Sequence, residues 1–393
     1  MSVRDARGAV AEFKLADHIE HGPFPLSRVE KGKLRPLMVI SHAQLLPTAT
    51  TQPWFEARVD KTHAPVYADT LLGLGGSGRS VWTAQPFAVA GSGIVFSGGR
   101  VTADLSNQFH DNAIAGNFRD VGLTNADGAL HAHDVRIAST TAVSPAGVTT
   151  SKSTITVAKL AYDSGSGPTL AIDDWLLSLS GARTGHLLDG MARYRFGHIQ
   201  SGSSDLGSLS IDAKVSHLDV PALDALNDAY QRTASGASSG AADDRALRDT
   251  IVAFLATEPR ISIDDFQWRT PKGTSTLTAD VRLTRPAGSG AGEAPQSLLD
   301  ALKEVDIDLS LSQPMVAGLI AQGGAAGGQP SAEADAEGAV RQVAARLIQA
   351  GMVREVGTQL VSHIRYQGRE VDLNGEKLPV NEFLLRAALL FMS

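Results

Sequence analysis

Apolar and polar residues alternate with a period of two along several stretches of this chain. In the segment LSIDAKVSH, Leu209 and Ile211 belong to the apolar set, and Ser210 and Asp212 belong to the polar set. The segments LTADVRL, at 277–283, and VDIDLSL, at 305–311, repeat the pattern. Because successive side chains of a strand point to opposite faces, each segment predicts a β-strand with one apolar and one polar face.

Further strands are predicted upstream, between turn sequences such as GSG, NADG, SPAG and SGSGP. We expect them at residues 80–90, 93–105, 114–123, 129–138, 153–162, 169–180 and 191–200. The fold class is therefore α+β and β-dominated, a long curved antiparallel sheet of consecutive hairpins with a few helices, mostly in the C-terminal half.

Helical periodicity appears mainly after residue 218. LDVPALDALNDAYQR has Asp219 as a candidate N-cap. A second helix is expected in DDRALRDTIVAFLATEP, at 243–259, which Pro259 ends, and others near 297–304, 314–322 and 333–350, the last capped by Gly351. Three short strands turning at Gly357, Gly368 and Gly375 should follow, and then a C-terminal apolar helix.

The chain is expected to divide into three segments. Residues 1–79 form an N-terminal segment with the His-Gly-Pro-Phe-Pro turn, and residues 80–235 an antiparallel β-meander ending in a helix. Residues 236–393 form an α+β half that shares the same continuous sheet.

Composition narrows the class of protein. The absence of cysteine excludes disulfides, thiolate zinc sites and cysteine nucleophiles, and no apolar run approaches the roughly 20 residues that span a bilayer. The net charge of -7 is modest, and lysine and arginine are scattered without a stripe that would bind phosphates. We therefore expect no nucleic-acid partner.

Four motifs in order suggest a family. HIEHGPFPL, GSLSIDAKVSHLDVPALDAL, PRISIDDFQWRTPKGTSTLTADVRL and IRYQGREVDLNGEKLP together resemble the YdgA-like family of bacterial proteins of unknown function, over most of residues 18–380. The resemblance implies a protein of the Gram-negative envelope, in the periplasm and tethered to the inner membrane by an N-terminal anchor. Only twenty residues precede His21, so we expect that anchor to lie outside this chain. The family supplies no catalytic residues.

The hexapeptide HGPFPL is interpreted as a turn. Gly22, Pro23 and Pro25 would fix a bend, with Phe24 packed inward and His21 hydrogen-bonded to the turn. Nothing acidic or nucleophilic lies beside His21 to form a catalytic group.

HAHD offers the clearest metal candidate. His131 and His133 would share one strand face, a spacing that can chelate zinc or copper if a third ligand such as His110 or Asp111 arrives from a neighbouring strand. A polar strand face would show the same pattern, and we expect no metal site here.

Other candidate motifs lack the context that their chemistry needs. GLGGSGRS at 73–80 has no following Lys-Ser/Thr and is expected to be a loop, and GASSG at 236–240 lacks the strand of a nucleophile elbow and is expected to be a linker. The pairs Asp173/Asp174 and Asp264/Asp265 would point to opposite faces of their strands, which favours edge or bulge roles. Asn374-Gly375 predicts a hairpin.

These observations predict a non-enzymatic periplasmic envelope protein that binds lipid or another apolar ligand in a sheet-lined groove. The alternative is a structural or assembly protein whose apolar sheet face forms a homodimer or binds another envelope protein. We expect no catalytic residues and no cofactor.

Overall fold

The computed structural model describes residues 2–4, 10–49, 51–53, 64–89, 94–125, 128–234, 241–285, 298–325 and 332–392. These residues group into two compact units. Unit 1 holds residues 1–178 and 200–202, and unit 2 holds residues 179–199 and 203–393. The three-segment division by sequence stays a prediction.

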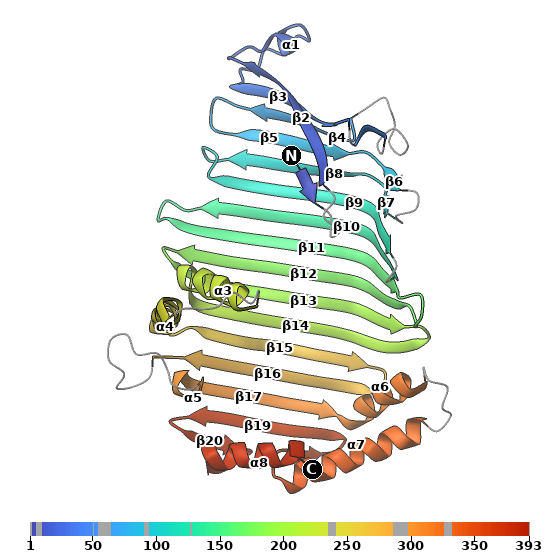
Figure 1. The fold of residues 1–393 in the computed structure, drawn as a ribbon, viewed down its shortest axis with the longest axis vertical. Helices are drawn as coiled ribbons and strands as arrows, with labels where there is room; N and C mark the ends of the chain where they lie inside the picture. Colours follow the sequence, from blue (N-terminus) through green and yellow to red (C-terminus); the bar gives the residue numbers. More distant parts are fainter. Residues whose placement is uncertain are drawn as a thin grey trace. The chain divides into compact units, whose positions relative to one another are not determined.

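Unit 1 is made almost entirely of antiparallel strands (Figure 1). The strands are β1 (Ser2–Arg4), β2 (Val10–His21), β3 (Val39–Pro47), β4 (Val66–Leu72), β5 (Gly78–Ala84), β6 (Phe87–Val89), β7 (Ile94–Phe96), β8 (Gly99–Ser106), β9 (Asp111–Asn125), β10 (Gly128–Val143), β11 (Val148–Asp163) and the first part of β12 (Leu170–Thr184). Their hydrogen-bonded order includes β1-β2-β3-β4-β5-β8-β9-β10-β11. Helical structure in the described part of this unit is limited to the four-residue α1 (Leu26–Val29) and residues 52–53.

β10 is irregular at Asp134, which has φ of 51° and is unpaired in the ladders to both neighbouring strands. Arg119 of β9 and Ala158 of β11 are left out of the ladders to β10 at the same level, so the register is the same on both sides and no strand holds an extra residue. The apolar positions of β10 change phase at this point, from Leu130 and Ala132 before it to Val135 and Ile137 after it.

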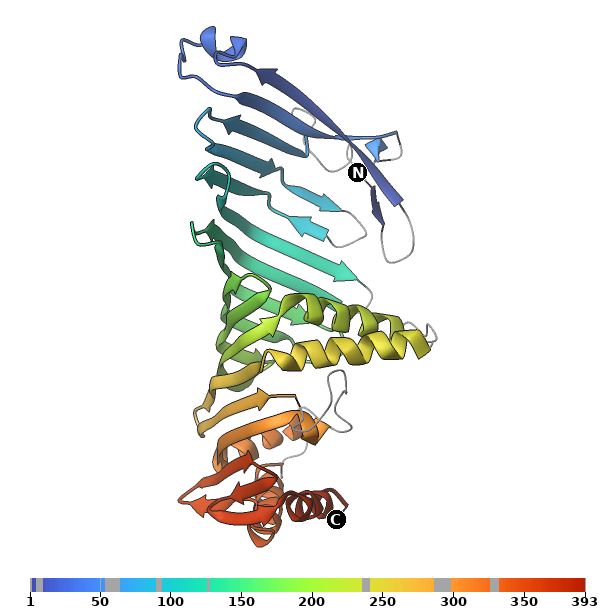
Figure 2. The same ribbon diagram turned by 90° about the vertical axis from the view of Figure 1, so that its left-hand side faces the viewer.

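Unit 2 combines antiparallel strands with helices (Figures 1 and 2). Its strands, after the end of β12, are β13 (Leu187–Ser201), β14 (Ser204–Asp219), β15 (Arg260–Thr270), β16 (Gly273–Leu283), β17 (Leu302–Ser312), β18 (Arg354–Val356), β19 (Gln359–Gln367), β20 (Glu370–Leu373) and β21 (Glu376–Pro379). The order β14-β15-β16-β17-β19-β20-β21 is antiparallel throughout, and β18 also pairs with β19.

The helices of unit 2 are α3 (Val220–Ala234), α4 (Ala241–Ala256), α5 (Leu298–Ala301), α6 (Gln313–Ala325), α7 (Ala332–Gln349) and α8 (Val380–Met392). The predicted N-cap is confirmed, because Asp219 Oδ1 accepts a hydrogen bond from the Ala222 N–H at 2.9 Å. Gly351, at φ of 72°, ends α7, and its N–H donates to the Ile348 carbonyl. None of the described helices is long and apolar enough to cross a membrane.

The core of unit 2 lies between the apolar face of its last strands and the C-terminal helices. Val371, Leu373, Leu378 and Tyr366 form one buried cluster, against which Phe383 of α8 packs. A second cluster joins Ala344 of α7 to Leu360 and Val353. Together with the uncovered strands of unit 1, this arrangement confirms the predicted fold class, β-dominated α+β with antiparallel hairpins and helices mostly in the C-terminal half.

The structure corrects one expectation about HGPFPL. As expected, the chain turns after β2, which ends at His21, because Gly22 has φ of 105°. Phe24, however, points outward and is 55% exposed. Pro25 is the buried residue of the bend, and Glu20 Oε2, not His21, accepts the hydrogen bond of the Ser27 N–H that holds it. The prediction that Phe24 packs inward was wrong because the buried proline takes the inner position.

Candidate functional site

The polar face of unit 2 carries a chain of charged side chains. Alternation places Asp280 and Arg282 of β16, Glu304, Asp306 and Asp308 of β17, and His363 and Arg365 of β19 on this face, and the strand register sets them side by side. Arg282 pairs with both Asp280 and Glu304, and Glu304 also pairs with Arg365. Arg260 extends the chain to β15 through Asp280.

Hydrogen bonds hold the carboxylates of this face in their charged form. Lys214 and the hydroxyl of Ser262 donate to Asp264, and these bonds lower the pKa of the Asp264 carboxyl. The bond to Asp280 raises the pKa of the Arg260 guanidinium. Asp264 is the extra residue where the registers of β14 and β15 shift, so the predicted bulge role of this acidic pair is confirmed.

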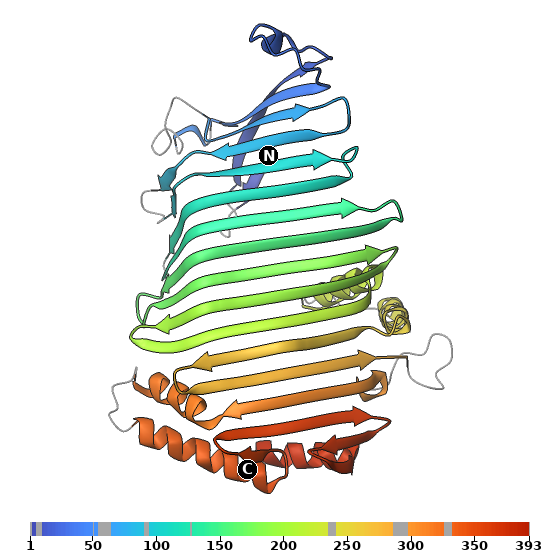
Figure 3. The same cartoon turned by 180° about the vertical axis from the view of Figure 1, so that it is seen from behind.

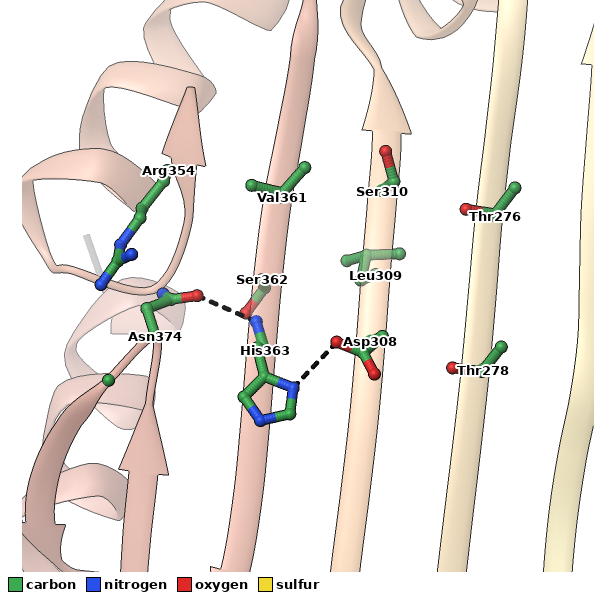
Figure 4. A pocket seen from close by; sticks show the side chains of 11 residues that line it. Thr276, Thr278, Asp308, Leu309, Ser310, Arg354, Val361, Ser362, His363 and Asn374 are labelled. Carbon is green, nitrogen blue, oxygen red and sulfur yellow. Dashed lines mark hydrogen bonds and ion pairs between the residues drawn. The ribbon is translucent and has the colours of Figure 1, made fainter. Parts of the chain in front are cut away.

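An open pocket of about 580 Å³ lies on the face at β16, β17 and β19 (Figure 4). His363 Nδ1 and Asp308 Oδ1 are 2.8 Å apart at its centre. Thr276 and Thr278 lie on the neighbouring strand, and Arg354 of β18 lies on the other side. The lining thus combines one acidic residue, one imidazole and one guanidinium with the apolar side chains of Leu309 and Val361.

Asn374 fixes the position of His363. Its side-chain Oδ1 accepts a hydrogen bond from the His363 N–H at 2.9 Å, and its own N–H donates to the His363 carbonyl at 2.8 Å. Its Nδ2 donates to the carbonyls of Gly351 and Met352. The sequence predicted only a hairpin at Asn374-Gly375, and the structure adds a buried amide that ties this turn to β19 and to the end of α7.

Asp306, Asp308 and His363 are the residues that could hold a metal ion. Their ligand atoms lie within 4.8 Å of one another. Within the described residues, no lysine or arginine is in ion-pair contact with either carboxylate. Carboxylate oxygen and imidazole nitrogen are ligands that zinc accepts, so the donor set is suitable for a divalent cation.

Sequence reasoning placed Asp306 and Asp308 on one face but did not bring His363 to them. Alternation within one strand shows which residues share a face, but it does not show which strand lies beside it or which residues stand opposite. Here that partner is β19, which begins 47 residues after β17 ends. The signal that was available was the alternation in QLVSHIRYQ, with His363 and Arg365 at polar positions.

The structure does not bring the predicted metal candidates together. His133 Nδ1 lies 2.7 Å from Asp120 Oδ1, and His131 lies beside Gly122 of β9. Asp111 begins β9, at the opposite end from Gly122, and accepts a hydrogen bond from the Val143 N–H. In the part of the chain that the structure describes, the one group of three ligating side chains is that of Asp306, Asp308 and His363.

The remaining sequence motifs lie in a turn, within a strand and outside the described residues. GLGGSGRS forms the turn between β4 and β5, closed by the Gly73 N–H donating to the Ser77 carbonyl, so it is the expected loop. Asp174 has φ of 52° within β12, and the edge or bulge role of Asp173/Asp174 stays a prediction. GASSG at 236–240 lies outside the described residues.

Unit 1 presents a row of exposed apolar side chains on three adjacent strands. Leu130 of β10 pairs in register with Leu123 of β9 on one side and Tyr162 of β11 on the other. Leu123 is 46% exposed, and Leu130 and Tyr162 are each 40% exposed. Val121, two residues from Leu123, is 38% exposed on the same face.

The comparisons define the class of protein. The chain matches a family described as bacterial proteins of unknown function (DUF945) over residues 4–381, and it belongs to that family. It is similar to Protein YdgA of Escherichia coli (strain K12), with 22% identity over 397 residues that cover 94% of this chain and 78% of that protein. The resemblance found in the sequence motifs is therefore confirmed. No solved structure matches the chain.

Proposed function

We propose that this protein is a non-enzymatic component of the Gram-negative envelope that binds a lipid or another apolar molecule on the exposed sheet face of unit 1. The proposal places it in the periplasm, tethered to the inner membrane. The observation that carries it is the row Leu123, Leu130 and Tyr162, at which three neighbouring strands expose large apolar side chains side by side.

The architecture of unit 1 supports the proposal. A sheet ordinarily buries its apolar face against another layer, but the helical residues in the described part of this unit are only the four of α1 and residues 52–53. Figure 3 shows β9, β10 and β11 side by side, with no helix of this unit over them on the side that faces the viewer. An apolar ligand bound across these strands would remove their apolar side chains from water. This burial would stabilise the complex by about 25 cal/mol for each Å² of apolar surface.

The polar side chains of unit 2 support a role other than catalysis. The Asp308–His363 pair would need a nucleophile in contact with the imidazole to resemble a catalytic triad. Ser310, the nearest serine on the same face of β17, instead donates its hydroxyl hydrogen bond to Gln359 Oε1 at 3.2 Å.

The test is native mass spectrometry of the protein purified gently from its own envelope, with two variants. Leu123→Ser removes an apolar side chain from the row, and Val95→Ser is the matched control. Val95 of β7 is 47% exposed and pairs with Gly122 of β9, the neighbour of Leu123 along the chain, so it lies on the opposite face of the sheet from Leu123. We expect lipid-mass adducts on the monomer of the wild type and of Val95→Ser, with at least a threefold loss in Leu123→Ser.

Two results would contradict the proposal. Equal adducts in both variants would show that the ligand binds elsewhere. A dimer free of adducts, dissociated by Leu123→Ser but not by Val95→Ser, would replace ligand binding by the alternative function, assembly of two copies through the same face.

A further inference from the structure

The connection between β2 and β3, residues 22–38, exposes apolar side chains although it is held in one conformation. We call it the β2–β3 tip. Leu26 is 69% exposed, Leu34 66% and Phe24 55%, whereas Leu37 of the same segment is 5% exposed. The tip therefore buries some of its apolar residues and directs others to the outside.

Hydrogen bonds fix this arrangement. The Gly22 N–H donates to the Met38 carbonyl and the Leu37 N–H to the Pro23 carbonyl, so both ends of the tip are closed. The Lys33 N–H donates to the Arg28 carbonyl at 2.9 Å, which folds the middle of the segment back on α1. The outward position of Leu26 and Leu34 is thus a property of the folded tip.

Basic residues alternate with the exposed apolar ones along the sequence of the tip. The tip contains Arg28, Lys31, Lys33 and Arg35 but only one acidic residue, Glu30, in a chain whose net charge is -7. Among the described residues, none of these four cations is in an ion pair. The glutamate next to the tip, Glu20, is engaged by Ser27, whose hydrogen bonds lower the pKa of the Glu20 carboxyl.

Figures 1 and 2 show α1 at the edge of unit 1, beyond the ends of β2 and β3 and with no other element of that unit over it. A surface that joins exposed apolar side chains to unpaired cations matches the interface of an anionic bilayer, where acyl chains lie directly beneath negatively charged headgroups. We infer that the β2–β3 tip is a docking site for an anionic phospholipid surface, into which Phe24, Leu26 and Leu34 insert while Lys31, Lys33 and Arg35 contact the headgroups.

The experiment is flotation of the full chain with vesicles of phosphatidylcholine, with and without about 30% phosphatidylglycerol. We expect at least tenfold stronger partition onto the anionic vesicles, reduced by about 0.5 M salt because surface charges are then screened. Leu26→Ser/Leu34→Ser should lower this partition about tenfold. Leu74→Ser, which changes a 62% exposed leucine of another hairpin, should not.

A second pair of variants tests the charges. Each basic residue near an anionic surface is worth about a fivefold change in partition, so Lys31→Glu/Lys33→Glu should abolish the preference for phosphatidylglycerol. Lys152→Glu/Lys159→Glu makes the same change of charge on exposed residues of β11 and should keep most of the binding.

Three results would overturn the inference. An equal loss of vesicle binding in both lysine double variants would mean that only the net charge of the protein matters. Unchanged vesicle binding by Leu26→Ser/Leu34→Ser would exclude insertion of the tip into the bilayer. Binding of duplex DNA that needs the lysines but not the leucines would identify a general polyanion site instead. Leu123→Ser is expected to leave vesicle binding unchanged, so this inference and the proposed apolar-ligand face fail separately.

Discussion

The guanidinium of Arg193 lies across the carboxylate of Asp212, with Nε 3.1 Å from Oδ1 and Nη2 2.9 Å from Oδ2. Arg195 Nη1 adds a further contact to Oδ1 at 2.6 Å. Asp212 is only 8% exposed, so the carboxylate of β14 depends on the two arginines of β13 for its charge compensation.

We expect Asp212→Asn to lower the free energy of unfolding by about 2–3 kcal/mol, the range for charged hydrogen bonds lost at a buried site. The side chains of Arg193 and Arg195 are 46% and 33% exposed, so water can solvate them once the carboxylate is gone. Asp104→Asn is the control, because Arg79 Nε is also 3.1 Å from Asp104 Oδ1 but both side chains are more than half exposed. It should cost less than about 1 kcal/mol, and urea unfolding measures both.

The same aspartate predicts a pH dependence. Burial raises the pKa of the Asp212 carboxyl, but the hydrogen bonds from Arg193 and Arg195 outweigh burial and the net pKa is lowered from 3.8. The ionised Asp212 carboxylate therefore contributes to the free energy of unfolding above pH 3.8, and this contribution is lost as the pH falls through its lowered pKa in the folded state. The stability difference between the wild type and Asp212→Asn should be constant from pH 7 to about 5 and shrink below about pH 4. A difference that grows on acidification would contradict this assignment.

Asn374 should be essential for the C-terminal strands. It combines φ of 56° with side-chain bonds to His363, Gly351 and Met352. We expect Asn374→Gly to cost about 2–3 kcal/mol, because glycine accepts the positive φ but leaves the buried partners unsatisfied. Asn374→Asp keeps the acceptor for the His363 N–H but loses both donors, so it should also destabilise the protein. A neutral effect of Asn374→Gly in urea unfolding would show that the amide is dispensable.

Position 207 has no space for a side chain, so only glycine fits there. At φ of 80°, a Cβ there would lie 1.9 Å from the Arg269 carbonyl oxygen of the neighbouring strand. Gly357 has a similar φ of 61° but no atom within 4 Å of the Cβ position. We expect Gly357→Ala to cost about 1–2 kcal/mol, from the left-handed conformation alone, and Gly207→Ala to cost clearly more in thermal unfolding. Equal costs would mean that β14 and β15 separate freely at this point.

Leu373 should dominate the last buried cluster. It is 1% exposed, and Leu373→Ala should cost about 2–5 kcal/mol through lost burial and the cavity left behind. Leu384 of α8 is 45% exposed, and Leu384→Ala is expected to change the stability by less than about 0.5 kcal/mol. Calorimetry of the two variants compares them directly.

The strands were predictable because alternation is a local property. The segment 305–311 shows its apolar and polar faces without knowledge of its neighbours, and the structure places it within β17. The same holds for the cap at Asp219, where one side chain and a backbone N–H three residues later decide the outcome.

Contacts between distant strands were not predictable from one sequence. The convergence of Asp306, Asp308 and His363 depends on the register of β17 and β19, and the outward position of Phe24 depends on the burial of Pro25 instead. The irregularity of β10 at Asp134 was also missed, because an aspartate with positive φ looks like any other polar residue in the sequence.

The irregularity at Asp134 makes the length of β10 a joint property of three strands. Arg119 of β9 and Ala158 of β11 are skipped at the same level, and the register is intact on either side. Removing Asp134 alone would therefore offset one half of β10 by one residue against both neighbouring strands. A single-residue deletion within β10 should be damaging, whereas removal of Arg119, Asp134 and Ala158 together would keep the three strands matched.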